Sequence, residues 1–266
     1  MTTASVRLVR APNPGPMTLE GTNTWLVGSP GDGPVVVVDP GPLLAVHLDA
    51  IMAAAPVGIG VVLLTHRHLD HAESAAELAQ RAGCGVRAAD PALRIGPEGL
   101  ADGDEIETTA ATLTVVSTPG HTGDSISLLL TGKDGRARLL TGDMVLGRGT
   151  TVITHPDGDL GAYLDSLRRL RALVAERNVV EILPGHGPVV SDPTGWLTYY
   201  YEHRLERLEQ VRSALAAGAG SPAEVVAMVY ADVDRRVWPA AEQSVRAQLG
   251  YLDGRQGSED SGGPHR

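Results

Sequence analysis

The sequence is poor in aromatic residues and contains no phenylalanine: aromatic side chains make up only 3% of its 266 residues. A chain of this length can still bury a sizeable core, which must then be built mainly from valine, leucine, isoleucine and alanine. Cysteine is almost absent too, because Cys84 is the only one. A single thiol excludes an internal disulfide framework and a thiolate cluster for zinc.

Long apolar runs and a surplus of positive charge are also missing. No apolar run reaches the roughly 18 residues expected of a membrane span, and the opening MTTASVRLVRAPNPGP lacks the apolar centre of a signal peptide. The formal net charge is -10, which disfavours a protein that wraps duplex DNA or lies on an anionic membrane. We therefore expect a soluble, cytoplasmic protein with no membrane and no duplex DNA partner. The sequence carries no signal for an oligomeric state.

Short aliphatic and β-branched runs recur along the chain and predict strands. Several are continuous rather than alternating, which is typical of strands covered on both faces. Helical patterns lie between them, over residues 72–82 and after Asp159, which can cap a helix. Strands and helices mixed in this way predict an α/β or α+β protein with sheets at its centre. The predicted strands are Val35–Val38, Val61–Leu64, Leu113–Val116, Ile126–Leu130, Arg138–Thr141 and Val179–Leu183.

The character of the sequence changes after Pro193. A long helical pattern covers residues 195–217, and a second helix is predicted from Ser221, which is followed by proline and then glutamate as in a capping box. A third helical pattern covers about 239–250. We expect three parts: a catalytic domain over residues 1–194, a small helical, winged-helix-like appendage over 195–253, and a disordered tail over 254–266.

Histidine and aspartate gather at the predicted ends of strands. The stretch THRHLDH follows one strand directly, and three other strand ends carry a histidine or aspartate next to glycine. Strand ends at one sheet edge are where open sheets gather ligands, and the glycines let the backbone turn so that the side chains converge. Imidazole with carboxylate suits zinc, although iron or manganese would also be accepted. The set is large enough for two divalent metal ions that share a ligand: His66, His68, Asp70, His71, His121, Asp143 and His186.

The stretch THRHLDH resembles the His-x-His-x-Asp-His signature of the metallo-β-lactamase superfamily, and the other signature residues follow in the same order over residues 10–195. The resemblance implies an α+β fold, an αββα four-layer sandwich with a binuclear site at one sheet edge. It also implies a role for each side chain. His66, His68 and His121 would bind one metal ion, Asp70, His71 and His186 the other, Asp143 would bridge the two, and Asp39 would orient a ligand.

The resemblance also implies a reaction. Two neighbouring divalent ions can lower the pKa of a shared water and clamp the attacked and leaving oxygens. The expected activity is therefore that of a binuclear metal-dependent hydrolase that uses a metal-bridging hydroxide. Asp70 would be catalytic, because it binds metal and orients the hydroxide or accepts its proton. No serine nucleophile competes, since the sequence lacks the G-x-S-x-G elbow of lipases.

The superfamily is chemically broad, so the fold does not name a substrate. Residues 13–28, 142–153 and 199–211 are similar to a β-lactamase-like group that includes an endoribonuclease, which makes phosphodiester cleavage of single-stranded RNA the first candidate. Hydrolysis of a small-molecule ester or thioester, as in the glyoxalase II type, is the second. Two other classes remain open: a mono-iron persulfide dioxygenase and a non-catalytic metal-binding protein.

One face of the predicted helix after Pro193 is a candidate substrate-binding surface. Tyr200, His203, Arg204 and Arg207 follow the spacing i, i+3, i+4 and i+7 and therefore share a face. The cations could hold a phosphate backbone or a ligand carboxylate while the tyrosine stacks on a base. The competing interpretation is a domain interface in which the arginines pair with nearby glutamates.

Overall fold

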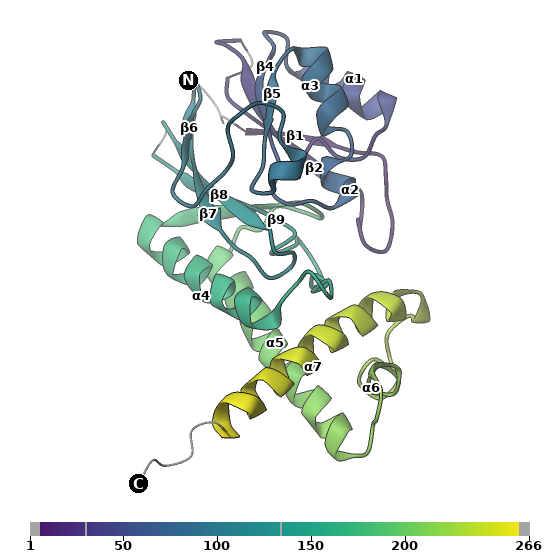
Figure 1. Ribbon diagram of the computed structural model, residues 1–266. Coiled ribbons are helices and arrows are strands. Elements are labelled where there is room, and N and C mark those ends of the chain that lie inside the picture. The colour runs from purple at the N-terminus through teal and green to yellow at the C-terminus, as the bar shows by residue number, and fades with distance from the viewer. Residues whose placement is uncertain (1–5, 30, 134, 261–266) are drawn as a thin grey trace.

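The computed structural model describes residues 6–29, 31–133 and 135–260, and two five-stranded sheets lie at its centre (Figure 1). The strand order in the first sheet is β1-β2-β3-β4-β5. Its first three strands are antiparallel, whereas β3, β4 and β5 are parallel. The strands are β1 (Val6–Arg10), β2 (Asn23–Val27), β3 (Val35–Val38), β4 (Ile59–Leu63) and β5 (Gly85–Arg87).

The second sheet has the order β10-β9-β8-β7-β6. Only β9 and β10 are parallel in it, and the other neighbours are antiparallel. All six strands predicted from the sequence are confirmed, each with ends shifted by at most two residues. The strands of this sheet are β6 (Glu105–Glu107), β7 (Ala111–Ser117), β8 (Ile126–Gly132), β9 (Ala137–Gly142) and β10 (Val179–Pro184).

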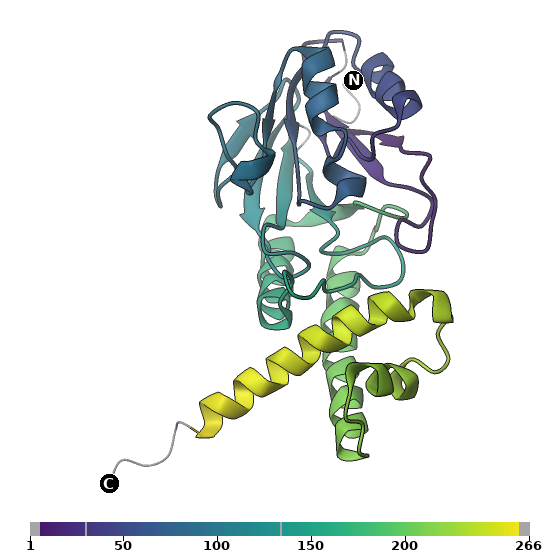
Figure 2. The same cartoon turned by 45° about the vertical axis from the view of Figure 1, so that its right-hand side comes forward.

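Helices cover the outer face of each sheet, which gives the predicted αββα sandwich (Figure 2). Strand β3 shows why its run of valines is continuous. Val36 and Val38 belong to the core between the sheets, whereas Val35 and Val37 pack under the helices of the first sheet. The helices on the first sheet are α1 (Ala45–Ala54) and α3 (Ala75–Ala82), with the short α2 (Leu69–Ala72) before α3. A 3₁₀ turn, η1 (Pro91–Leu93), follows β5.

Helix α4 (Leu160–Arg177) covers the second sheet together with the start of α5 (Pro193–Ala216). The Asp159 carboxylate accepts a hydrogen bond from the Ala162 N–H at 2.7 Å, so the predicted cap of α4 is confirmed. Helix α5 begins two residues before its predicted start, at Pro193, because Asp192 caps it through the Gly195 N–H at 3.0 Å.

The C-terminal region is built on the far half of α5. Helices α6 (Pro222–Val229) and α7 (Trp238–Asp260) pack on it and on each other, with a 3₁₀ turn, η2 (Arg235–Val237), between them (Figure 1). The Ser221 hydroxyl accepts from the Glu224 N–H at 3.3 Å, as the capping pattern predicts. Residues of α4, α5, α6 and α7 share one hydrophobic cluster with β8, β9 and β10.

The C-terminal tail and the absence of a membrane span were both predicted from the sequence. Helix α7 runs through Asp260, so residues 254–260 are helical where we expected disorder, and residues 261–266 lie outside the described part. Within the described residues, none of the helices combines the length and the apolar character that crossing a bilayer requires.

Candidate metal centre

Strand direction brings the histidine-bearing loops together. Strands β7 and β9 both run antiparallel to β8 and are therefore parallel to each other, and β10 is parallel to β9. Their C-terminal ends consequently lie at the same edge, where the loops after them carry His121, Asp143 and His186. In the first sheet, β3 and β4 are parallel and end in Asp39 and the THRHLDH loop.

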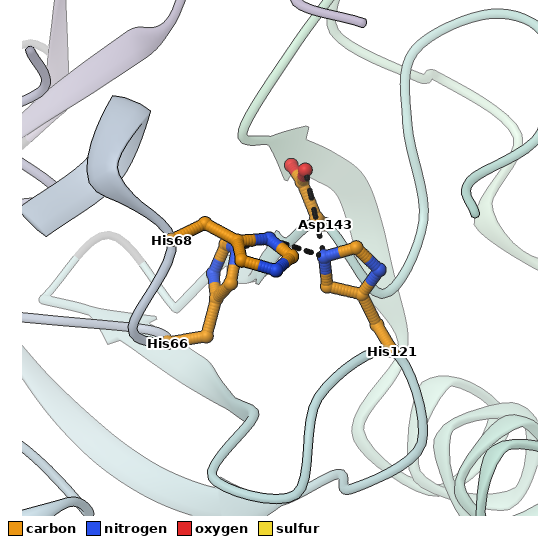
Figure 3. Close-up of side chains that lie close together, drawn as sticks. All are labelled: His66, His68, His121 and Asp143. Carbon is orange, nitrogen blue, oxygen red and sulfur yellow. Dashed lines mark hydrogen bonds and ion pairs between the residues drawn. The ribbon is translucent and has the colours of Figure 1, made fainter. Parts of the chain in front are cut away.

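The first group of ligand atoms comes from three imidazoles and one carboxylate (Figure 3). His68 Nδ1 lies 3.1 Å from His66 Nε2 and 3.0 Å from His121 Nε2. Asp143 completes the group, with Oδ2 at 3.8 Å from His121 Nε2. Three ring nitrogens and a carboxylate directed at one point are a donor set that a divalent cation fits.

The second group contains Asp70, His71 and His186. His186 Nε2 lies 3.1 Å from both His71 Nε2 and Asp70 Oδ2. Asp143 Oδ1 is 3.4 Å from His71 Nε2 and 3.5 Å from His186 Nε2, but it is buried and has no hydrogen-bond partner among the described residues. One oxygen of Asp143 therefore faces each group, which is the position that the bridging prediction requires.

Asp39 holds the ring nitrogens of His66 and His71 that point away from the centre, directly or through Thr65. His71 Nδ1 donates to Asp39 Oδ2 at 2.9 Å. Thr65 donates its N–H and its hydroxyl to the same carboxylate at 2.8 and 2.7 Å, and His66 Nδ1 lies 3.0 Å from that hydroxyl. Such contacts fix the tautomer and turn the opposite nitrogen toward a metal ion. Asp39 lies where the sequence predicted an orienting group, whereas Thr65 was not predicted.

Backbone carbonyls hold two further rings. His121 Nδ1 donates to the Val152 carbonyl at 2.5 Å, and His186 Nδ1 donates to the Gly21 carbonyl at 3.4 Å. With the two rings held through Asp39, four imidazoles present Nε2 to the centre. His68 alone of the five site histidines presents Nδ1.

Charges in the centre are strongly coupled. Burial lowers the pKa of His66 well below its usual value and that of His121 to about 4, which favours the neutral imidazole that binds metals. Burial acts in the same direction on His186, but the Asp143 carboxylate outweighs it and raises the pKa to about 9. The pKa of Asp143 stays well below its usual value because the His186 and His71 imidazoles outweigh the effect of burial. The carboxylates beside His71 and His186 thus favour positive charge at the second group, as a metal ion would supply it.

Two glycines make room for this arrangement. Gly142 has φ +49°, and a Cβ there would lie 2.4 Å from the Thr65 hydroxyl oxygen. A Cβ on Gly185 would lie 2.7 Å from Asp143 Oδ1 and from the His71 ring. The predicted role of the glycines beside the ligands is thus confirmed by close approach as well as by backbone conformation.

A cavity of about 470 Å³ extends from the metal centre to the C-terminal helices. His68, Asp70, His121 and Asp143 line one end, and the other end is lined by residues of α5, η2 and α7 and of the loop after α6. The face of α5 that we predicted divides between the wall and the interior. His203, Arg204 and Arg207 line the cavity.

Tyr200 does not line the cavity, and the prediction that it stacks on a base is wrong. Its side chain is fully buried, and its hydroxyl accepts from the Leu146 N–H at 2.9 Å. The competing interpretation is supported in part. Tyr200 and Arg204 are buried against the sandwich, as a domain interface requires, but neither Arg204 nor Arg207 forms the expected ion pair with a glutamate of the described residues.

Comparison with known proteins agrees with the geometry. A family model described as the metallo-beta-lactamase superfamily matches residues 17–186, and one described as the beta-lactamase associated winged helix domain matches residues 221–253. A Drosophila melanogaster protein named beta-lactamase-like protein 2 homolog is 31% identical over 277 residues, covering 94% of this chain and 88% of that protein.

Two further likenesses bear on activity and on fold. A protein from Aspergillus chevalieri named atrochrysone carboxyl ACP thioesterase is 33% identical, covering 88% of this chain and 76% of its own. The crystal structure of a metallo-beta-lactamase family protein from Thermus thermophilus has a TM-score of 0.77 at 20% identity, covering 95% of this chain and 94% of that one, and this likeness shows the fold. With a family match over most of its length and ligand groups able to hold metal ions, the chain belongs to the metallo-β-lactamase superfamily and is a metal-dependent hydrolase.

Proposed function

We propose that the protein is a binuclear hydrolase that cleaves a small-molecule thioester into a carboxylic acid and a thiol. The position of Asp143 carries the proposal, because one of its oxygens faces each ligand group at the end of the cavity. The ligand set without thiolate favours zinc in both positions, with iron or manganese as alternatives.

Bound divalent ions would polarise the thioester carbonyl and lower the pKa of a water molecule at the centre. The chain's own residues contribute orientation and proton transfer. Asp70 is the most exposed carboxylate of the centre, at 30% against 11% for Asp143, and it lines the cavity. Burial opposes ionisation of Asp70, but the hydrogen bond from His186 and the charges of His71 and His186 together outweigh it and lower the pKa, so Asp70 is ionised. An ionised carboxylate at this position can orient a water molecule and accept its proton once metal ions have acidified that water.

The cavity favours a small thioester over RNA. Away from the metal centre, many of its wall residues are apolar, among them Met17, Leu19, Val233, Val237 and Ala240. An RNA strand would need a cationic track along its backbone, whereas the cations of the cavity wall are the arginines Arg148, Arg204 and Arg207 and the chain as a whole has a net charge of -10. Relatives named as thioesterases support the same choice. Cleavage of single-stranded RNA, the first candidate on the sequence alone, remains the second proposal.

The test is a substrate panel on zinc-loaded protein. Release of thiol from acyl-N-acetylcysteamine thioesters, followed with a thiol reagent, is compared with cleavage of a labelled single-stranded RNA oligonucleotide. We expect thioester turnover that disappears in Asp143→Ala and persists in Asp165→Ala, an exposed aspartate on α4. RNA cleavage that disappears in Asp143→Ala, without thioester turnover, would contradict the proposal.

The division of the chain remains a proposal as well. The two family matches leave all of α5 unassigned, and α5 contributes to both the core under the second sheet and the cavity wall. We keep the boundary at residues 194 and 195, in the first turn of α5, because α5 supports α6 and α7.

A further inference from the structure

Arg204 is a buried cation at the wall of the cavity. Only 3% of the residue is exposed. Its guanidinium donates to the Thr151 carbonyl and lies over the Tyr163 ring, with Cζ 5.1 Å from the ring centroid. Its Nε has no hydrogen-bond partner among the described residues. At least one donor of this buried cation is therefore not used by the described residues.

No acidic side chain compensates this charge. Arg204 forms no ion pair with the described residues, and the only carboxylates that line the cavity are Asp70 and Asp143 of the metal centre. A buried charge without a counter-ion is costly. Arg207, one turn further along α5, adds to the excess, because its partners among the described residues are the Gln210 amide, the Val229 carbonyl and the Tyr230 ring.

The pKa of the neighbouring His203 is also affected by these positive charges. Burial lowers its pKa, and the charges of Arg204 and Arg207 lower it further. An imidazole kept neutral by its neighbours leaves the two guanidinium groups as the local cations. This end of the cavity is thus suited to an anion, although the chain as a whole is acidic.

Arg204 is also close to the reacting centre. It contacts the carbonyl of Thr151, and the hydroxyl of the same residue lies 3.3 Å from His121 Nδ1. Only Thr151 therefore lies between the guanidinium and His121, one of the predicted metal ligands. The wall beyond it is apolar, with Val237, Ala240 and Ala241 from η2 and α7. A ligand that fits has an apolar body and one anionic group near the scissile bond.

We infer that Arg204 binds a carboxylate of the substrate, so that the preferred thioester carries a carboxylate a few bonds from its carbonyl group. The inference rests on the proposed thioesterase function and names its substrate class. Arginine is suited to this task, because its planar fork binds carboxylate through two parallel hydrogen bonds. The alternative is that Arg204 only braces the loop that holds His121.

The test compares matched thioesters on the metal-loaded full chain. One substrate is succinyl-N-acetylcysteamine, and its neutral partner is the methyl ester of the same succinyl group. A third, butyryl-3-mercaptopropionate, carries the carboxylate on the thiol side. We expect kcat/KM to be at least about 30-fold higher for a carboxylate-bearing substrate than for the neutral ester. A ratio of this size corresponds to the loss of one buried charge-assisted contact. The substrate that is preferred shows which side of the thioester the carboxylate occupies.

Variants then separate binding from bracing. Arg204→Met should abolish the preference mainly through KM, and Arg204→Lys should retain part of it. Arg212→Met, on an exposed part of α5, should retain all of it. Equal kcat/KM for the acidic and neutral substrates in the wild-type protein would overturn the inference, even where Arg204→Met fails to fold. So would an equal loss for all substrates in Arg204→Met, which is the signature of a brace.

A binding measurement keeps the two proposals distinct. Chelator-treated protein is titrated with succinate and with monomethyl succinate in a calorimeter, which avoids binding of carboxylate to metal ions. Tighter binding of succinate that is lost in Arg204→Lys and Arg204→Met supports the carboxylate site, even where no thioester is hydrolysed and the proposed function fails. Equal binding of the two compounds, or binding unaffected in both variants, overturns the carboxylate site. The proposed thioesterase function is then tested by the hydrolysis assay alone.

Discussion

The two ends of the cavity are built in different ways. At the metal end, loops after strands of both sheets deliver the ligands, and hydrogen bonds of 2.5–3.4 Å hold the outward nitrogens of four imidazoles. At the other end, arginines of α5 have few partners and no acidic ones among the described residues. The sandwich thus fixes a centre for chemistry, whereas the helical region supplies a less constrained wall that can select the substrate.

The largest effect is expected at the residue that joins the two ligand groups. Asp143→Ala removes the carboxylate that faces both groups and leaves His71 and His186 without the charge that raises their pKa. We expect near-complete loss of thioester hydrolysis and loss of at least one metal ion per chain, measured by elemental analysis. Asp165→Ala, on the exposed face of α4, is the control. Full activity in Asp143→Ala would contradict the proposal that the metal end of the cavity carries out the chemistry.

The next effect concerns the group that orients the ligands. Asp39→Asn keeps the shape of the side chain but removes the anionic acceptor for His71 and Thr65. Partners of this kind typically contribute about 10–100-fold to metal affinity or activity, and we expect a loss in that range by metal titration with a competing chelator. Asp102→Asn, whose carboxylate pairs with Arg169 on the surface, should leave metal affinity unchanged. A loss of the same size in both variants would refute the orienting role.

A smaller effect separates support from substrate binding at the helical end. Tyr200→Phe removes the acceptor of the buried Leu146 N–H, which should cost about 1–3 kcal/mol of the free energy of unfolding. Because Tyr200 does not line the cavity, KM should stay unchanged. Chemical denaturation and steady-state kinetics measure the two quantities. Tyr199 lines the cavity wall, so Tyr199→Phe should show the reverse: the free energy of unfolding should change little, whereas KM should change. A rise in KM with unchanged stability in Tyr200→Phe would restore the substrate role that we withdrew.

The last effect is on pH-dependent stability, at a buried imidazole of the sandwich outside both ligand groups. His47 lies on α1 with Nε2 2.9 Å from the Thr24 hydroxyl, and burial lowers its pKa from 6.5 to about 4. The unfolded chain therefore binds one more proton between these pH values, so acidification from pH 6.5 to 4 lowers the free energy of unfolding.

Denaturation curves of the wild type and His47→Gln across this range measure the effect. The wild type should lose stability more steeply than the variant, by up to about 1.4 kcal/mol per pH unit. Parallel pH profiles would show that His47 is not the group responsible.

The metal end could be predicted from sequence because its signals are local. Each ligand sits in a short motif after an aliphatic strand, and strand direction then fixes the shared edge. The acceptors that orient the rings could not be predicted. The Val152 and Gly21 carbonyls are backbone groups that any residue supplies, and Thr65 differs from other threonines only in what surrounds it.

The helical end was predicted less well, for a physical reason. Helical spacing shows which residues share a face, but not which neighbour covers that face. Tyr200 and Arg204 lie on the buried side of α5, whereas His203 and Arg207 are half-buried at the cavity. Strands β5 and β6 have three residues each and lack a run long enough to detect. The extension of α7 to Asp260 had no signal, because the stretch from Gly254 is rich in glycine and charge.

Stepwise metal titration shows whether the two ligand groups joined by Asp143 form one hydrolytic centre. Zinc is added stepwise to chelator-stripped protein while hydrolysis of a carboxylate-bearing thioester is recorded against the metal content of the chain. The account predicts that activity rises to a plateau at two zinc ions per chain and that His186→Ala, which removes a ligand of the second group, abolishes the plateau. Full activity with a single iron ion, unaffected by His186→Ala, or full metal loading without any hydrolysis, would contradict it.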